Sequence, residues 1–333
     1  MAGLIGGSGS TGSSLLRQIL NRHSHVFCGP ETSLFCKSEL YNNWSEHKKA
    51  IQKKGWGGLR SKSWHIFRGF ELTKEEFNVT EDLLTRMIDQ SETFKSFIEK
   101  YFEHCTESSE DIWLEKTPGN AYGFRQFLNL FPKGKVIHIY RNPYDTIASL
   151  VSRGFSHYQA TCIYLLNTTF ALSSKNSSSY TQLSYERLVN NPKQEVTALC
   201  SHLEIAYEEE MLMPTDKTFS DDPTQIKGWT YDETAPIAKG SIGKFSTLSK
   251  KDQEIIIYAC KSIHVAPNTF KKENLSHINI HSLSKELDYD FVELRTPSYY
   301  SVLKNQKNKD LWLRTKKNAY YNFFNYPIVL NII

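Results

Sequence analysis

The feature that most restricts how this chain can fold is a run of glycine and hydroxyl residues near its start, from Gly6 to Ser14. Apolar Leu4 and Ile5 precede the run and are typical of a strand end, and Ser13 to Arg22 has the apolar periodicity of a helix. A strand, a glycine-rich loop and a helix in this order predict backbone N–H groups that converge on an anion. The positive end of the helix would add to the attraction.

The loop lacks the lysine typical of loops that bind nucleoside triphosphates. Gly7 and Gly12 fit the glycine positions of that pattern, but Ser13 stands where the lysine belongs. The loop therefore predicts a phosphate site of another kind. The residues expected to contact the anion are Gly9, Ser10, Thr11, Gly12, Ser13 and Ser14.

Composition excludes some classes of partner. The chain has 333 residues, enough for one large domain, and its formal net charge of +4 is small and dispersed. We therefore expect a small anionic ligand and no nucleic acid. The six cysteines form no Cys-x-x-Cys pair, so we expect buried thiols, no disulfide framework and no metal site. No charged leader or long apolar run is evident, which predicts a cytoplasmic protein without a membrane span.

Alternating strand and helix patterns predict an α/β fold, a single domain with a mainly parallel central sheet flanked by helices. If the first two strands are parallel neighbours, the glycine-rich loop and Glu31 emerge at the same carboxyl edge of the sheet. The expected strands after the loop cover residues 26–28, 111–116, 135–140 and 180–185, and the expected helices cover 120–131, 192–202, 249–263 and a segment beginning at Pro143.

Two further regions differ from this alternating pattern. Residues 34–110 look helical with interruptions, and we expect them to form an insertion that binds an acceptor. Acidic residues give way to basic ones near residue 294, so we divide the chain into a domain of residues 1–270 and an appendage of residues 271–333. The apolar, aromatic end of the appendage predicts packing against the domain or self-association into a homo-oligomer.

Several ordered blocks of the sequence resemble the sulfotransferases that use 3′-phosphoadenosine 5′-phosphosulfate (PAPS), which have a P-loop-like domain, and are most similar to the tyrosylprotein and bacterial branch. The similarity covers roughly residues 3 to 265. The blocks are the loop with its helix, residues 28–32, 115–118 and 136–149, Ser184 to Val189, and Lys239 to Phe245.

The resemblance implies a set of residues that bind the donor. Arg141 and Ser149 match the ligands of the 3′-phosphate, and an arginine at a strand end does offer a bidentate fork to a phosphate. Tyr185 matches a position near the adenine, although a core tyrosine is nearly as good an interpretation. A late loop that closes over the phosphates is matched by Lys239, Ser241 and Lys244.

The resemblance also implies catalytic residues, with Glu31 as the base and Lys116 as the cation near the transferring group. Family members normally carry lysine or arginine where this chain has Ser10, so Lys116 becomes the best cation, with Arg17 and Lys37 as weaker substitutes. Lys116 could instead serve in a structural ion pair. His65 or His104 could replace Glu31 as base.

The implied reaction transfers a sulfuryl group from PAPS to a hydroxyl, with no metal. The acceptor could be a tyrosine, a glycan, or a sterol or other small alcohol, and Trp56, Trp64 and Phe67 slightly favour an apolar or aromatic one. Two alternatives remain open. One is a kinase-like phosphotransferase with Glu115 as a magnesium-binding acid. The other is a non-catalytic nucleotide-binding protein, suggested by Ser10 and the basic, aromatic tail.

Overall fold

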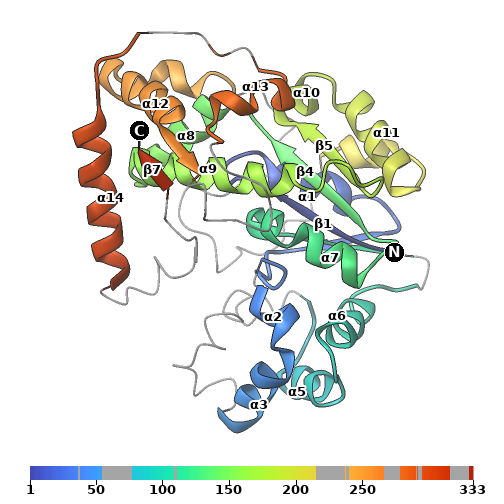
Figure 1. Ribbon diagram of the computed structural model, residues 1–333. Coiled ribbons are helices and arrows are strands. Elements are labelled where there is room, and N and C mark those ends of the chain that lie inside the picture. The colour runs from blue at the N-terminus through green and yellow to red at the C-terminus, as the bar shows by residue number, and fades with distance from the viewer. Residues whose placement is uncertain are drawn as a thin grey trace.

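A central sheet with helices on both faces forms the body of the molecule, and further helices lie below it in the view of Figure 1. The computed structural model describes residues 1–36, 38–54, 77–108, 111–214, 237, 240–265, 278–289, 291, 295–315 and 330–332.

The sheet has five strands in the order β2-β3-β1-β4-β5, and every neighbouring pair is parallel, so the expected α/β fold is confirmed. The condition considered above, that the first two strands are neighbours, does not hold, because β3 lies between β1 and β2. Since all the strands are parallel, the loop after β1 and Glu31 still emerge at one edge. The strands are β1 (Ala2–Gly7), β2 (Val26–Gly29), β3 (Ile112–Lys116), β4 (Lys135–Tyr140) and β5 (Tyr180–Ser184).

Successive residues of a strand face opposite sides of the sheet, and each side has its own core. Ile5 belongs to the core under α1 (Ser13–Asn21), α10 (Tyr185–Asn190) and α11 (Pro192–Leu203). Leu4 belongs to the opposite core, which includes α7 (Phe124–Leu130). The short 3₁₀ helices η1 (Pro118–Gly123) and η2 (Glu209–Leu212) contact β1 and α1 respectively.

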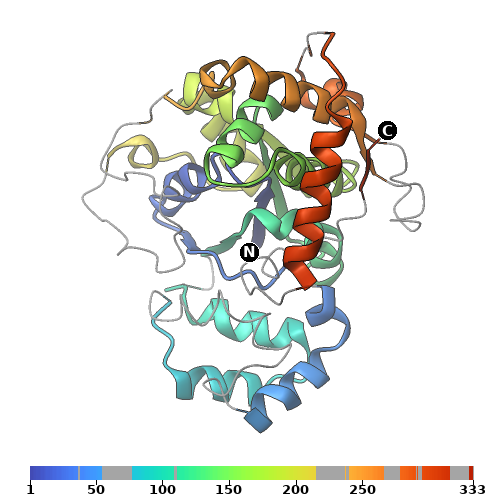
Figure 2. The same cartoon turned by 90° about the vertical axis from the view of Figure 1, so that its left-hand side faces the viewer.

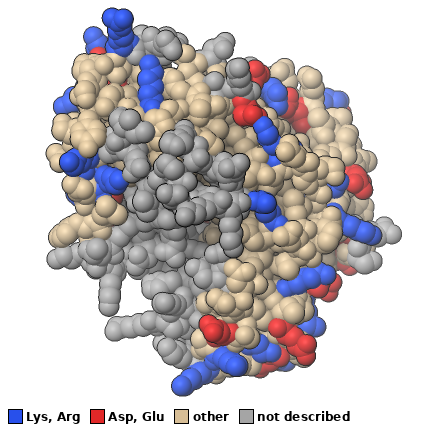
Figure 3. All heavy atoms as spheres, viewed as in Figure 1, with Lys and Arg blue, Asp and Glu red and all other residues tan. Residues whose placement is uncertain are grey.

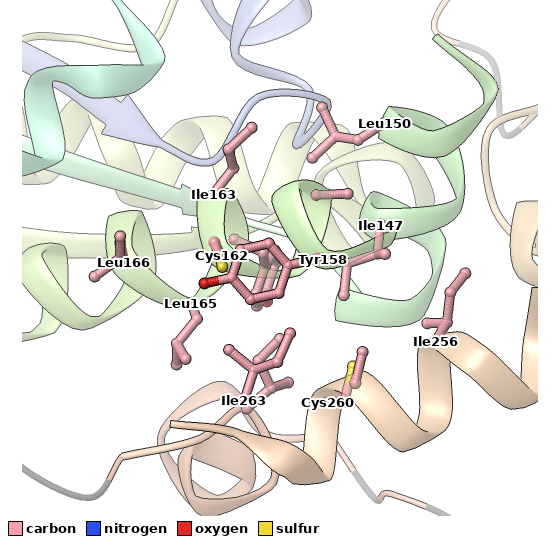
Figure 4. Packing of buried hydrophobic residues seen from close by; sticks show 14 of the residues in the cluster. Ile147, Leu150, Tyr158, Cys162, Ile163, Leu165, Leu166, Ile256, Cys260 and Ile263 are labelled. Carbon is pink, nitrogen blue, oxygen red and sulfur yellow. The ribbon is translucent and has the colours of Figure 1, made fainter. Parts of the chain in front are cut away.

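A third core forms where α8 (Pro143–Ser152), α9 (His157–Leu172) and α12 (Lys250–Ser262) meet. Figure 4 shows their side chains pointing toward one another, with Tyr158 of α9 in the middle and Ile263 of β6 (Ile263–Val265) beside it. This packing fixes α8, which carries Ser149, against the rest of the body.

The region 34–110 contains four described helices, which lie as a group below the sheet in Figures 1 and 2. Aromatic side chains fill their core and join it to the sheet, because Phe102 stacks on Trp113 of β3 with ring centroids 4.3 Å apart. Whether this region binds an acceptor stays a prediction. Its helices are α2 (Ser38–Asn42), α3 (Trp44–Lys54), α5 (Glu81–Asp89) and α6 (Phe94–Glu103).

The region after residue 270 packs against the body. In α14 (Tyr300–Thr315), Asp310 accepts a hydrogen bond from Ser156 at 2.8 Å. β7 (Leu330–Ile332) pairs antiparallel with β6. Self-association through this region stays a prediction. Two short helices, η4 (His281–Leu283) and α13 (Ser284–Leu287), also belong to it.

Charges of both signs are interspersed over the face drawn in Figure 3, which agrees with the dispersed charge of the sequence. Among the described helices, none has the length and apolar character needed to cross a membrane. All six cysteines are free; Cys36 and Cys105 are only partly buried, and the others are buried.

Histidine 138 makes stability depend on pH. It is fully buried in β4, its Nδ1 lies 2.9 Å from the Tyr180 hydroxyl, and burial lowers its pKa from 6.5 to about 3. Between these values the unfolded chain binds the proton and the folded chain does not, so stability falls as pH falls, by about 1.4 kcal/mol per pH unit.

We predict that the slope due to this histidine disappears in His138→Gln. Urea unfolding of both proteins at several pH values from 7 to 4.5 measures it. Tyr180→Phe keeps the imidazole and should retain the slope. Equal slopes for wild type and His138→Gln would contradict the prediction.

Candidate active site

Each strand of the sheet ends in a residue or loop expected to act at the site. Because the strands are parallel, these groups meet at one edge. They are the loop after β1, Glu31 just beyond β2, Lys116 at the end of β3, Arg141 directly after β4 and Tyr185 directly after β5.

The loop after β1 is shaped by close contacts that only glycine allows. Gly12 adopts a positive φ of 90° at the start of α1, and a Cβ there would lie 2.3 Å from the Tyr185 ring. The Thr11 hydroxyl donates to the Ser8 carbonyl at 2.7 Å. Among the residues that the structure describes, no side chain caps the start of α1, so the N–H groups of its first turn remain available to an anion.

Arg141 is buried where three parts of the site meet. Its Nη1 donates to the Ser10 carbonyl at 3.0 Å, its Nη2 donates to the Ser241 carbonyl, and its guanidinium lies over the Tyr185 ring. Its Nε has no hydrogen-bond partner among the described residues, and neither has the buried hydroxyl of Ser8. Ser149 is buried on α8. Unpaired buried donors beside an uncapped helix start fit a multiply charged anion.

A second arginine, which the sequence interpretation missed, contacts the loop. Arg153 follows the last turn of α8, and its Nη1 donates to the Ser10 hydroxyl at 2.7 Å. A signal was present in the sequence, because Arg153 is four residues after Ser149 and so lies on the same side of the helix. The contact brings a cation to the position where the loop itself has none.

Lys244 completes a group of three cations. It begins the 3₁₀ helix η3 (Lys244–Thr247), and its pKa is lowered first by burial and then by the charges of Arg141 and Arg153. Burial and the charge of Arg141 also lower the pKa of Arg153. Like charges held this close attract an anionic ligand.

Glu31 and Lys116 form an ion pair, with Nζ 2.5 Å from Oε1. The lysine side chain is 4% exposed, whereas the glutamate side chain is 25% exposed. Lys116 pairs in register with Ile5 on β1, so the pair lies one strand away from the glycine-rich loop. A carboxylate open to solvent and a buried cation are therefore held together beside the anion site.

The neighbouring Glu115 plays a different part. Its Oε1 accepts three hydrogen bonds, from the Thr32 N–H at 2.8 Å, the Thr32 hydroxyl at 2.9 Å and the Thr117 hydroxyl at 2.7 Å. Its Oε2 accepts one from Asn120. Burial raises its pKa and these hydrogen bonds oppose the rise. Glu115 thus fixes the backbone next to Glu31, and its oxygens are already engaged, which weakens its proposed role as a magnesium ligand.

The structure describes some of the other predicted residues, and the rest lie outside the described part of the chain. Ser13 is buried at the start of α1, Ser14 follows it, and Gly9 and Thr11 are buried in the loop. Nε2 of His104 lies 3.0 Å from the Asn78 carbonyl. The residues outside the described part of the chain are Lys37, Trp56, Trp64, His65, Phe67 and Lys239.

Within the described part of the chain, no group of three or more His, Cys, Asp or Glu side chains is placed to hold a metal ion.

Comparison with known proteins shows the family and the fold of the chain. The model of the sulfotransferase family matches residues 4–209. No curated protein matches the chain.

Among solved structures, the sulfotransferase domain of the Synechococcus PCC 7002 olefin synthase is 17% identical, with a TM-score of 0.57 over 88% of this chain and 95% of that one. The sulfotransferase domain of the curacin biosynthetic pathway is 21% identical, with a TM-score of 0.49 over 88% of this chain and 98% of that one. A sulfotransferase from Alicyclobacillus acidocaldarius is 12% identical, with a TM-score of 0.40 over 87% and 96%.

The similarity to the olefin synthase domain supports the fold, and the match to the family model supports the family assignment. The resemblance found in the sequence blocks is thereby confirmed. Because the match spans more than half of the chain, this protein belongs to the sulfotransferase family, a class of PAPS-dependent transferases.

Proposed function

We propose that this protein transfers a sulfuryl group from PAPS to a hydroxyl acceptor. The observation that carries the proposal concerns Ser10. Its carbonyl accepts a hydrogen bond from Arg141, and its hydroxyl accepts one from Arg153. Two arginines thus converge on the phosphate loop, one strand away from the Glu31–Lys116 pair. One edge of the sheet therefore holds both cations suited to bind an anion and a carboxylate suited to accept a proton.

The residues present suit the two ends of the donor. The backbone of residues 9–14 and the start of α1 would hold the 5′-phosphosulfate. Arg141 and Ser149 would hold the 3′-phosphate, and Tyr185 would contact the adenine. Ser241 and Lys244 lie on the loop beside Arg141, and Lys239 precedes them in sequence.

The chemical step exchanges one sulfur–oxygen bond for another. The acceptor oxygen bonds to sulfur, while the bond from sulfur to the 5′-phosphate oxygen breaks and its electron pair leaves with the phosphate. Glu31 takes the proton of the acceptor hydroxyl. Lys116 and Arg153 stabilise the negative charge that develops on the leaving phosphate.

The proposal specifies the acceptor only as a hydroxyl: a tyrosine, a glycan, or a sterol or other small alcohol. The aromatic residues of α2 to α6 that the structure describes do not narrow this choice, because they fill the core of that region. Trp44 is 5% exposed and Phe97 is fully buried.

Two other functions would fit part of this site. A kinase-like reaction loses its main support, because Glu115 holds Thr32 and Asn120. A non-catalytic nucleotide-binding protein would keep the arginines but would not need the Glu31–Lys116 pair, so substitution of Glu31 separates it from an enzyme.

Binding of adenosine 3′,5′-bisphosphate tests the donor site. We expect Arg141→Ala to weaken it roughly 100-fold in calorimetry, because a buried bidentate phosphate contact is lost. Exposed Arg86 on α5 provides the control, Arg86→Ala, which should bind like wild type. Preference of wild type for ATP with magnesium, or equal binding by Arg141→Ala, would contradict the assignment.

Transfer of labelled sulfate from PAPS to a pool of hydroxyl acceptors tests the base. We expect Glu31→Gln to lower kcat roughly 100- to 10,000-fold with little change in the donor KM, because the proton acceptor is lost. Exposed Glu92 gives the matched control Glu92→Gln. Equal turnover by Glu31→Gln and wild type would remove Glu31 from the mechanism, and no turnover by wild type would favour the non-catalytic alternative.

The same assay tests whether Arg153 supplies the charge that Ser10 cannot. We expect Arg153→Ala to lower kcat/KM for the donor roughly 10- to 100-fold and Arg153→Lys to recover part of it, because the charge is the essential feature. Ser10→Ala should lower kcat/KM less, because Arg153 and Lys116 both remain. Unchanged kinetics for Arg153→Ala would leave Lys116 as the cation of the reaction.

A further inference from the structure

The loop that carries Ser241 and Lys244 is held to the first turn of α8 by one buried carboxylate. Asp145 is 5% exposed. Its Oδ2 accepts the backbone N–H of Gly243 at 2.7 Å, and its Oδ1 accepts that of Phe245 at 2.8 Å. The two oxygens of one side chain therefore clamp the backbone on both sides of Lys244.

The same carboxylate belongs to the proposed phosphate site. Its Oδ2 lies 3.7 Å from Nη2 of Arg141, and this nitrogen also donates to the Ser241 carbonyl. Asp145 thus joins the loop and the arginine into one unit. A simple counter-ion for Arg141 would not need two backbone N–H groups from a distant part of the chain.

Electrostatic repulsion explains why the loop needs such a clamp. Lys244 lies near Arg141 and Arg153, whose charges lower its pKa in addition to burial, whereas the charge of Asp145 raises it. Three cations repel one another, which favours movement of the loop away from Arg141. Two hydrogen bonds to a carboxylate oppose this movement.

The residue next to Asp145 holds the loop through apolar contact. The Tyr144 ring stacks on Phe245, with centroids 5.0 Å apart. Tyr144 is itself fixed by the region after residue 270, because its hydroxyl lies 3.0 Å from Nε2 of His281 and its ring packs edge-on against Phe291. Asp145 and Tyr144, which are neighbours on α8, therefore hold the same loop, the first by hydrogen bonds and the second by ring stacking.

We propose that Asp145 is a positioning residue that keeps loop 241–245 closed against Arg141 and so determines how long the nucleotide stays bound. The inference rests on the proposed function, because it takes Arg141 as a ligand of the nucleotide. It assigns to the carboxylate a role in retaining the donor and in releasing the bisphosphate product.

Asp145→Asn distinguishes a clamp from a counter-ion. The substitution removes a negative charge beside Arg141, so loss of a mere counter-ion would tighten binding of an anion. Loss of a clamp would weaken it, because an amide has one acceptor oxygen where the carboxylate has two. We expect adenosine 3′,5′-bisphosphate to dissociate about tenfold faster in stopped-flow measurements and the donor KM to rise, with the acceptor KM unchanged.

Asp111 offers a matched control at the opposite edge of the sheet, just before β3. Its Oδ2 also accepts two backbone N–H groups, from Glu107 at 3.0 Å and Ser108 at 2.9 Å. Asp111→Asn makes the same loss of charge in a carboxylate that also accepts backbone N–H groups, but away from the nucleotide site, and it should leave the dissociation rate unchanged. Phe245→Ala, which retains Asp145 and Arg141, should speed dissociation and provides a second test if Asp145→Asn folds poorly.

Hydrogen exchange shows whether the loop itself is released. In Asp145→Asn the amides of Gly243 and Phe245 should exchange faster, while those of β1 and β4 keep their protection. Normal bisphosphate binding by wild type together with tighter or unchanged binding by both Asp145→Asn and Phe245→Ala would overturn this inference alone. Failure of wild type to bind the bisphosphate would overturn the proposed function and, with it, the role in retention.

Discussion

All five strands of the central sheet run in the same direction, and this constraint determines where the proposed functional groups lie. Parallel strands end at one edge, and their crossover helices must cover the faces, so the edge is left to loops. The glycine-rich loop, Glu31, Lys116, Arg141 and Tyr185 meet there although they are far apart in sequence. The three hydrophobic cores hold the sheet and α8 in the positions that make this meeting possible.

The charged groups at this edge lie on two sides of β1 and differ in whether they are paired. Arg141 and Arg153 both contact Ser10, and Lys244 lies near these two arginines, so that the repulsion among the three cations is offset by Asp145 and would be relieved by an anionic ligand. On the other side of β1, Lys116 is neutralised by Glu31. A buried lysine requires such a partner, and the partner is also the more exposed group of the two, as the proposed role of Glu31 as base requires.

Much of this arrangement could be predicted from the sequence, because local patterns report local structure. The strand, loop and helix around Gly12, and Arg141 at a strand end, follow from periodicity and residue type. The order of the strands could not be predicted in this way. The apolar pattern of a strand shows that the strand is buried but not which strands lie beside it, so the position of β3 between β1 and β2 was not expected. Arg153 was missed although its helical spacing from Ser149 was visible, and the contact of His281 with Tyr144 depends on distant packing.

The central claim is that groups at the ends of β1, β4 and β5, together with Ser149 of α8, hold one nucleotide. A crystal structure of the protein with adenosine 3′,5′-bisphosphate tests it most directly. The 5′-phosphate should lie against the backbone N–H groups at the start of α1, with the 3′-phosphate on Arg141 and Ser149 and the base beside Tyr185. A bisphosphate bound elsewhere, or one whose phosphates contact neither Arg141 nor the loop after β1, would contradict it.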